Sequence, residues 1–213
     1  MELIEPTLID MRKLFLSLAI AAVAAGSAAA QITVGAGYLN QTTVNSISEN
    51  TSSDGTMHGF YVGAGFSWPL VAGLSIDSGV SYNYLVSNED ILGAGFLNSK
   101  TENSILEIPV NLRYRFHAAS FLDIFALAGP RFNVGLASTT TASVLDLEKE
   151  INNYGEDSNL QRFDFGLGAG IGFELFQLVR LDVGYDWGLL DLNKTEAVTT
   201  RNSRFHVGLA VMF

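Results

Sequence analysis

The feature that most constrains this chain is a two-residue alternation of apolar and polar side chains, which is the period of a β-strand whose two faces meet different surroundings. It is clearest over residues 106–116, Leu-Glu-Ile-Pro-Val-Asn-Leu-Arg-Tyr-Arg-Phe, and it recurs at 162–175, 179–187 and 205–213. Four further segments follow it less strictly, namely 32–39, 59–68, 74–85 and 122–136. The sequence therefore predicts an all-β domain of eight strands.

The connections between these segments alternate in length. Short links fall near 71–73, 117–120 and 176–177, whereas long stretches rich in Ser, Thr, Asn and acidic residues occupy 41–56, 87–103, 138–159 and 191–202. We expect the long stretches to be solvated loops. Alternation of short turns with long outer loops is typical of up-and-down barrels of the bacterial outer membrane, in which an even strand number returns both ends to the periplasmic side.

Two kinds of eight-stranded barrel fit this pattern. A soluble lipocalin-like barrel has an apolar interior, whereas a transmembrane barrel presents its apolar face to lipid. The apolar face here carries many Trp, Tyr and Phe residues near strand ends, as in an interfacial girdle. The polar face is rich in glycine, for example at every second residue of 166–172, which makes room for long side chains in a narrow lumen. We therefore predict an eight-stranded antiparallel transmembrane β-barrel with short periplasmic turns and long outer loops.

The polar face carries seven acids and six arginines, which is close to charge balance. A buried charge is tolerated only when it is paired, and the guanidinium fork suits carboxylates in a confined space. We expect a cross-strand charge network that fills the lumen, with Arg113, Arg115 and Arg131 sharing Glu107, Asp123 and nearby carboxylates. Its candidate members are Asp77, Glu107, Arg113, Arg115, Asp123, Arg131, Arg162, Asp164, Glu174, Arg180, Asp182, Asp186 and Arg204.

The first thirty residues contain the features of a secretory signal peptide. Met11-Arg12-Lys13 is a short basic region, residues 14–25 are almost entirely apolar, and Ala28-Ala29-Ala30 fits the small-residue rule for cleavage. We interpret 11–30 as a cleaved signal peptide and 31–213 as the barrel domain. Residues 1–10 contain three acids, so we interpret them as an upstream extension before a true start at Met11. A membrane anchor is the alternative, but the apolar run is short for a spanning helix.

The sequence lacks the motifs that are typical of several kinds of binding and catalytic site. The chain has no Cys, so disulfides and thiolate metal sites are excluded, and His58, His117 and His206 show no metal-ligand spacing. The glycines of 166–172 repeat every two residues, unlike a nucleotide-binding loop, and no G-x-S-x-G motif is present. We expect no catalytic residue, no cofactor and no metal. The long loops hold twelve acids against four bases, so the outer surface should repel nucleic acid.

Residues 106–116, with their Leu-Glu-Ile-Pro, resemble a strand of the outer-membrane β-barrel domain common in Bacteroidetes, whose members are often labelled porin family. Residues 125–131, which end in Ala-Gly-Pro-Arg, resemble that family's next strand, and 164–173 and 183–189 resemble its late strands. The final strand, which ends in Phe213, resembles the recognition signal of the barrel assembly machinery. The resemblance covers nearly all of 31–213 and implies no shared catalytic motif.

These observations favour a structural or surface-interaction role in the cell envelope, with a filled, charge-paired lumen. A narrow, low-conductance porin for small solutes is the alternative, since open aqueous channels belong to barrels of about 16–18 strands. A lipid-modifying enzyme of the outer membrane is less favoured, because no matched set of Ser and His residues stands out. We expect a monomer that contacts outer-membrane lipid and lipopolysaccharide, meets the assembly machinery during biogenesis and binds no nucleic acid.

Overall fold

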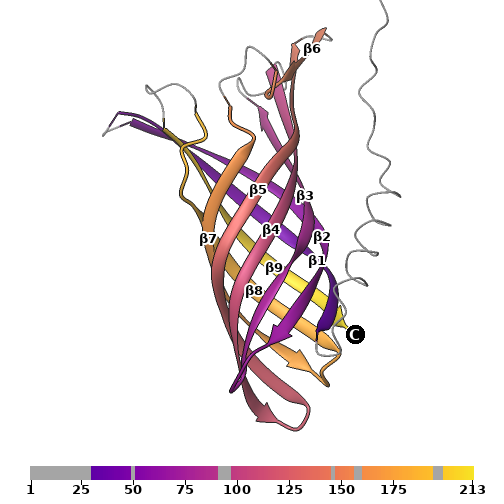
Figure 1. Ribbon diagram of the computed structural model, residues 1–213. Coiled ribbons are helices and arrows are strands. Elements are labelled where there is room, and N and C mark those ends of the chain that lie inside the picture. The colour runs from indigo at the N-terminus through magenta and orange to yellow at the C-terminus, as the bar shows by residue number, and fades with distance from the viewer. Residues whose placement is uncertain (1–29, 49–50, 91–96, 145–146, 156–159, 194–198) are drawn as a thin grey trace, which may run out of the picture.

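The computed structural model describes residues 30–48, 51–90, 97–144, 147–155, 160–193 and 199–213 (Figure 1). The interpreted upstream extension and almost all of the interpreted signal peptide fall in residues 1–29, outside the described residues, so both stay predictions. Within the described residues, no helix is long and apolar enough to cross a membrane.

The described chain forms nine strands, of which eight close into an antiparallel barrel. Around the barrel the order is β1-β2-β3-β4-β5-β7-β8-β9, and β9 pairs with β1 to close the ring. The remaining strand, β6, pairs only with the outer part of β5 (Figure 1). The prediction of an eight-stranded antiparallel barrel is confirmed. The strands are β1 (Gln31–Ser48), β2 (Thr51–Pro69), β3 (Leu74–Asp90), β4 (Leu97–Ala119), β5 (Leu122–Val144), β6 (Leu147–Asn152), β7 (Phe163–Leu175), β8 (Val179–Gly188) and β9 (Thr199–Met212).

The strands are longer than the alternation indicated. A tilted strand needs about 9–11 residues to cross a membrane, whereas β4 and β5 each contain 23 residues. Much of the polar stretches 41–56, 87–103 and 138–159 is therefore strand rather than loop. Alternation fades there because both faces of an extension beyond the membrane can meet water, while hairpin pairing still satisfies the backbone N–H and C=O groups.

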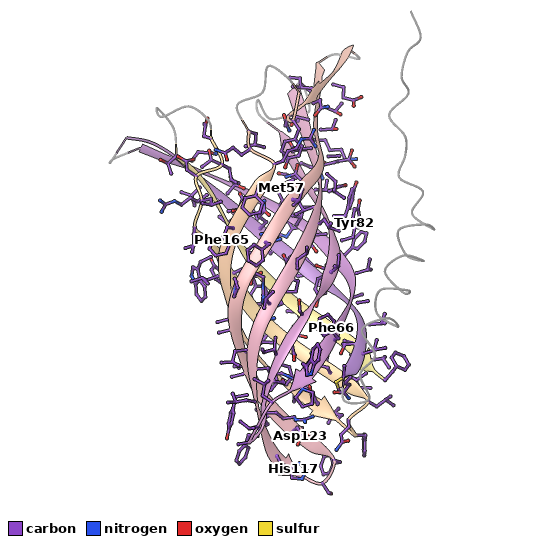
Figure 2. The ribbon with its side chains drawn as sticks, viewed as in Figure 1. Met57, Phe66, Tyr82, His117, Asp123 and Phe165 are labelled. Carbon is purple, nitrogen blue, oxygen red and sulfur yellow. The ribbon has the colours of Figure 1, made fainter. Side chains whose placement is uncertain are left out.

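The outward surface of the barrel is apolar. Among the described residues, 31 large hydrophobic side chains are exposed, whereas only seven hydrophobic residues are buried. Sixteen polar or charged residues are buried instead, which inverts the distribution of a water-soluble protein. Aromatic side chains lie toward both ends of the barrel, with Tyr82 and Phe165 toward the outer end and Phe66 toward the turns (Figure 2). Such an exterior matches a lipid environment with an aromatic girdle at each interface.

Short turns close one end of the barrel, as the sequence predicted. Residues 70–73 join β2 to β3, and residues 176–178 join β7 to β8. Ala72, Gly73, Phe176 and Gln177 have positive φ, as a tight two-residue hairpin turn requires. The hairpin of β4 and β5 extends farthest at this end, and the β6 extension and the ends of the other long strand pairs lie at the opposite, outer end (Figure 1).

Candidate functional site

The lumen is where the inward side chains of all eight barrel strands meet. It is layered along the barrel axis. A turn-side cluster comprises Asp77, Arg113, Arg115, Glu174 and Arg180, and a mid-barrel cluster comprises Glu107, Arg131, Asp186, Arg204 and His206. Beyond them come an apolar layer of Leu39, Met57, Leu85 and Ile105 and then an outer cavity.

Glu174 of β7 is the centre of the turn-side cluster. Its side chain is fully buried and accepts hydrogen bonds from Arg113 and Arg180, the latter at 2.8 Å. Arg115 contacts its other oxygen at 3.4 Å. Asp77 is the second carboxylate, with Arg113 Nε at 3.0 Å and Arg180 Nη1 at 3.3 Å. Two carboxylates, from β3 and β7, thus join three guanidinium groups from β4 and β8, so the cluster spans the lumen rather than following one wall.

An aromatic ring holds this cluster from one side. Phe125 of β5 is 2% exposed, and its ring centroid lies 5.6 Å from Cζ of Arg113 and 5.2 Å from Cζ of Arg180. Both distances are within the range of a cation–π contact. Phe125 is absent from the residues expected in the lumen, although its position in β5, two residues from Asp123, places it on the inward face. The alternation of β5 alone could have placed Phe125 in the lumen, but an apolar residue was expected to face lipid.

The mid-barrel cluster links β4, β5, β8 and β9. Glu107 forms an ion pair with Arg204 at 2.7 Å and lies 3.8 Å from Nε of Arg131. Arg131 donates to Asp186 at 2.9 Å. His206 lies 3.6 Å from Asp186 and 3.6 Å from Asp182. A cavity of about 180 Å³ separates this cluster from the turn-side cluster.

The expected sharing of carboxylates differs from the arrangement in the structure. Arg131 does approach Glu107, but Arg113 and Arg115 share Glu174 instead. Asp123 contacts His117 at 2.6 Å, so the expectation that it serves the arginines is wrong. Asp123 is the second residue of β5, and its carboxylate contacts His117 on the other side of the turn that joins β4 to β5 (Figure 2). Asp164, also expected in the network, is partly buried on β7 with one carboxylate oxygen that has no hydrogen-bond partner.

Arg162 lies outside the lumen, contrary to expectation. Its side chain is exposed and donates hydrogen bonds to the backbone oxygens of Gly135, Leu136 and Tyr154. Its guanidinium also lies 4.7 Å from the centroid of the Tyr154 ring. Arg162 precedes the first residue of β7, so alternation along that strand does not set its direction. It connects the segment that follows β6 to the outer part of β5.

We expect Arg162→Ala to loosen this segment without changing the barrel. A loss of about 1–2 kcal/mol of local stability would raise the equilibrium constant for local unfolding of this segment roughly 5–30-fold. Limited proteolysis of the purified protein should then cut near residues 153–155 correspondingly faster. Arg201→Ala, which removes another exposed arginine near the outer end, is the matched control. Equal cleavage rates in both variants would show that Arg162 does not hold the segment.

The outer cavity has a volume of about 310 Å³ and is lined mainly by amides and hydroxyls. Thr43 donates to Asn202 at 2.7 Å, and Thr200 donates to Asn45 at 2.8 Å. Tyr154 is half-buried at the wall, and burial raises the pKa of its phenol above the ordinary value. Backbone N–H groups of Thr200 and Asn193 lower the pKa of Asp191, which precedes the lining residue Leu192 in the chain.

Comparisons with known proteins concern the whole barrel. A family model described as outer membrane protein beta-barrel domain matches residues 24–194. Similar solved structures include Ail, the attachment invasion locus protein of Yersinia pestis, in complex with the heparin analogue sucrose octasulfate (11% identity, 86% of this chain and 99% of that chain, TM-score 0.45). Neisserial surface protein A is another (18% identity, 88% and 99%, TM-score 0.45). A third is the outer membrane enzyme PagL (12% identity, 85% and 98%, TM-score 0.46). Among curated proteins no match is found.

Proposed function

The chain belongs to the outer membrane protein β-barrel domain family and is located in the bacterial outer membrane, and from this premise we propose that it is a solute-tight barrel with a structural or surface-interaction role. The observation that carries the proposal is the turn-side cluster, in which buried Glu174 joins three arginines across the lumen. A barrel whose interior is filled in this way anchors and displays its outer parts rather than conducting solutes.

Three successive layers support a closed lumen. The turn-side cluster and the mid-barrel cluster each join side chains across the interior, and the apolar layer adds buried side chains from four neighbouring strands, β1 to β4. Separating the ion pairs would leave buried charges without partners, which is costly. An eight-stranded barrel is narrow enough for its side chains to fill. Opening a path therefore requires breaking contacts rather than moving one loop.

The outer end supports the display role. There β4, β5 and β6 form a sheet that extends away from the barrel, whereas short turns join the described strands at the opposite end (Figure 1). Building such extensions requires many residues beyond the 9–11 that a crossing strand needs. We infer that this end contacts lipopolysaccharide and external partners. The proposal further assigns the chain to the Bacteroidetes porin-family type, which residues 106–116 and 125–131 resemble, and treats it as a monomer without enzymatic activity or nucleic-acid binding.

A narrow pore is the second candidate. The cavity of about 180 Å³ between the two clusters favours it, because it is a wider segment within an otherwise filled lumen. For conduction the turn-side cluster would have to rearrange.

Planar-bilayer recording tests the proposal. We expect the purified wild-type barrel to give no stable conductance steps, because the ion pairs block the lumen. The variant Arg113→Ala/Glu174→Ala removes one charge of each sign from the turn-side cluster and should conduct measurably more. Lys100→Ala/Glu102→Ala, a charge-balanced change in an exposed pair with 3.0 Å between Nζ and Oε1, is the control and should stay silent. Large, regular ohmic steps from the wild type would overturn the closed-barrel proposal and favour the pore.

A further inference from the structure

We propose that the outer cavity is a binding site for an uncharged carbohydrate, in the size range of one or two sugar rings. The inference deepens the surface-interaction role and rests on it, because the cavity lies at the end of the barrel assigned to external contacts. The cavity is enclosed by β1, β2, β3, β4, β5 and β9 together with the segments that follow β6 and β8. Its floor is the apolar layer, to which Met57 and Ile105 contribute (Figure 2 labels Met57).

The lining excludes a charged ligand. None of the lining residues that the structure describes is acidic, basic or a histidine, whereas the cavity between the two clusters is lined by Asp77, Glu107, Arg131 and other charged residues. A charged ligand would lose its hydration here without gaining an opposite charge, which is strongly unfavourable. The volume of about 310 Å³ is at the small end of ordinary ligand pockets, which span about 300–1,000 Å³. The site therefore suits a small neutral molecule.

The polar groups suit a ligand rich in hydroxyls. The side-chain oxygen of Asn202 accepts from Thr43, and that of Asn45 accepts from Thr200. Each of these contacts orients an amide by its oxygen, so its NH₂ group, with two N–H donors, is directed to the other side. The side-chain oxygen of Asn103 likewise accepts from Ser138 at 2.6 Å, while its NH₂ group donates to Sδ of Met57 at 3.2 Å. Amides that are already oriented lose little conformational entropy when a ligand binds.

The remaining surface suits the apolar faces of a sugar ring. Ile105, Leu192 and Tyr154 line the same cavity as the amides. Tyr154 is held in place by the guanidinium of Arg162, and its hydroxyl packs against Gly135, where a Cβ atom would collide with it. An aromatic ring with one apolar face and a polar tip is suited to a ligand that has both kinds of surface. Amides, hydroxyls and apolar patches in one uncharged cavity together indicate a carbohydrate.

Titration with defined sugars tests the inference. The full chain, in a zwitterionic detergent without a sugar headgroup, is titrated with maltose, cellobiose and diacetylchitobiose by calorimetry and saturation-transfer NMR. We expect saturable binding of at least one of them with a Kd on the order of 0.1–1 mM, typical of few-contact sites. Asn45→Ala/Asn202→Ala should weaken that binding by about tenfold or more, since 1.4 kcal/mol corresponds to a factor of ten. Asn40→Ala, on the outward face of β1, is the matched control and should bind like the wild type.

Three outcomes would overturn the inference. They are no saturable binding of any of the three sugars, unchanged affinity in the double variant, and preferential binding of an anionic probe such as sucrose octasulfate or of an acidic peptide. The heat-dependent gel mobility of each variant verifies that it is folded before titration. The bilayer experiment separates this inference from the proposed function, because a silent wild-type barrel without sugar binding removes only the carbohydrate site.

Discussion

Replacing Glu174 by alanine is expected to lower the free energy of unfolding by about 3–5 kcal/mol, the range for removing one partner of a buried ion pair. Its carboxylate is fully buried and contacts Arg113, Arg115 and Arg180. Without it, Arg113 and Arg180 keep only Asp77 as a carboxylate partner. Several positive charges would then share one negative charge at a site that side chains close off from water.

The measurement is urea unfolding of the detergent-solubilised barrel, followed by the fluorescence of Trp68 and Trp187. Glu174→Gln should fall between the wild type and Glu174→Ala, because an amide oxygen still accepts a hydrogen bond but carries no charge. Glu102→Ala is the control, since Glu102 pairs with Lys100 on the exposed surface and such pairs contribute within about 1 kcal/mol. A midpoint for Glu174→Ala equal to that of the control would show that the lumen cluster does not stabilise the barrel.

Replacing Gly129 by alanine is expected to destabilise the barrel by about 3 kcal/mol or more, at or beyond the upper end of overpacking effects. A Cβ atom at Gly129 would lie 1.9 Å from the backbone oxygen of Val110 and 2.8 Å from Cα of Asn111. Backbone atoms cannot rotate away as a side chain can, so β4 and β5 would have to separate. Gly129 lies where the segment of β4 that contains Pro109 is opposite the segment of β5 that contains Pro130. In the pairing of β4 with β5, this place falls between the pairs Pro109↔Arg131 and Leu112↔Ala128.

Heat-dependent gel mobility and the urea midpoint measure this effect. The control is Gly55→Ala, because a Cβ atom at Gly55 meets nothing within 4 Å although the residue also lies in a barrel strand. We expect the control to fold like the wild type and Gly129→Ala to remain largely in the unfolded, unshifted form. Equal stability of the two variants would contradict the close approach of β4 and β5 at Gly129.

Much of the fold follows from the sequence because the boundary between lipid and lumen runs along every strand. Each residue at the membrane level of a strand faces one environment or the other, so a period of two is imposed locally and can be recognised without tertiary information. This is why residues 106–116 and 163–175 indicated both their strands and their faces. Most of the acids and arginines assigned to the lumen, including Glu174, Arg113 and Arg131, lie there for the same reason.

The choice of partners in the lumen was decided only by the tertiary structure. Strand tilt and stagger determine which residues of distant strands reach the same level, and no local pattern encodes them. Glu174 thus meets Arg113 from β4, 61 residues away in the chain, while Asp123 meets His117 at the turn. Alternation also carries no information where both faces meet water. Arg162, the extensions of β4 and β5 and the uncharged outer cavity were for that reason visible only once the barrel had closed and the outer segments had packed against it.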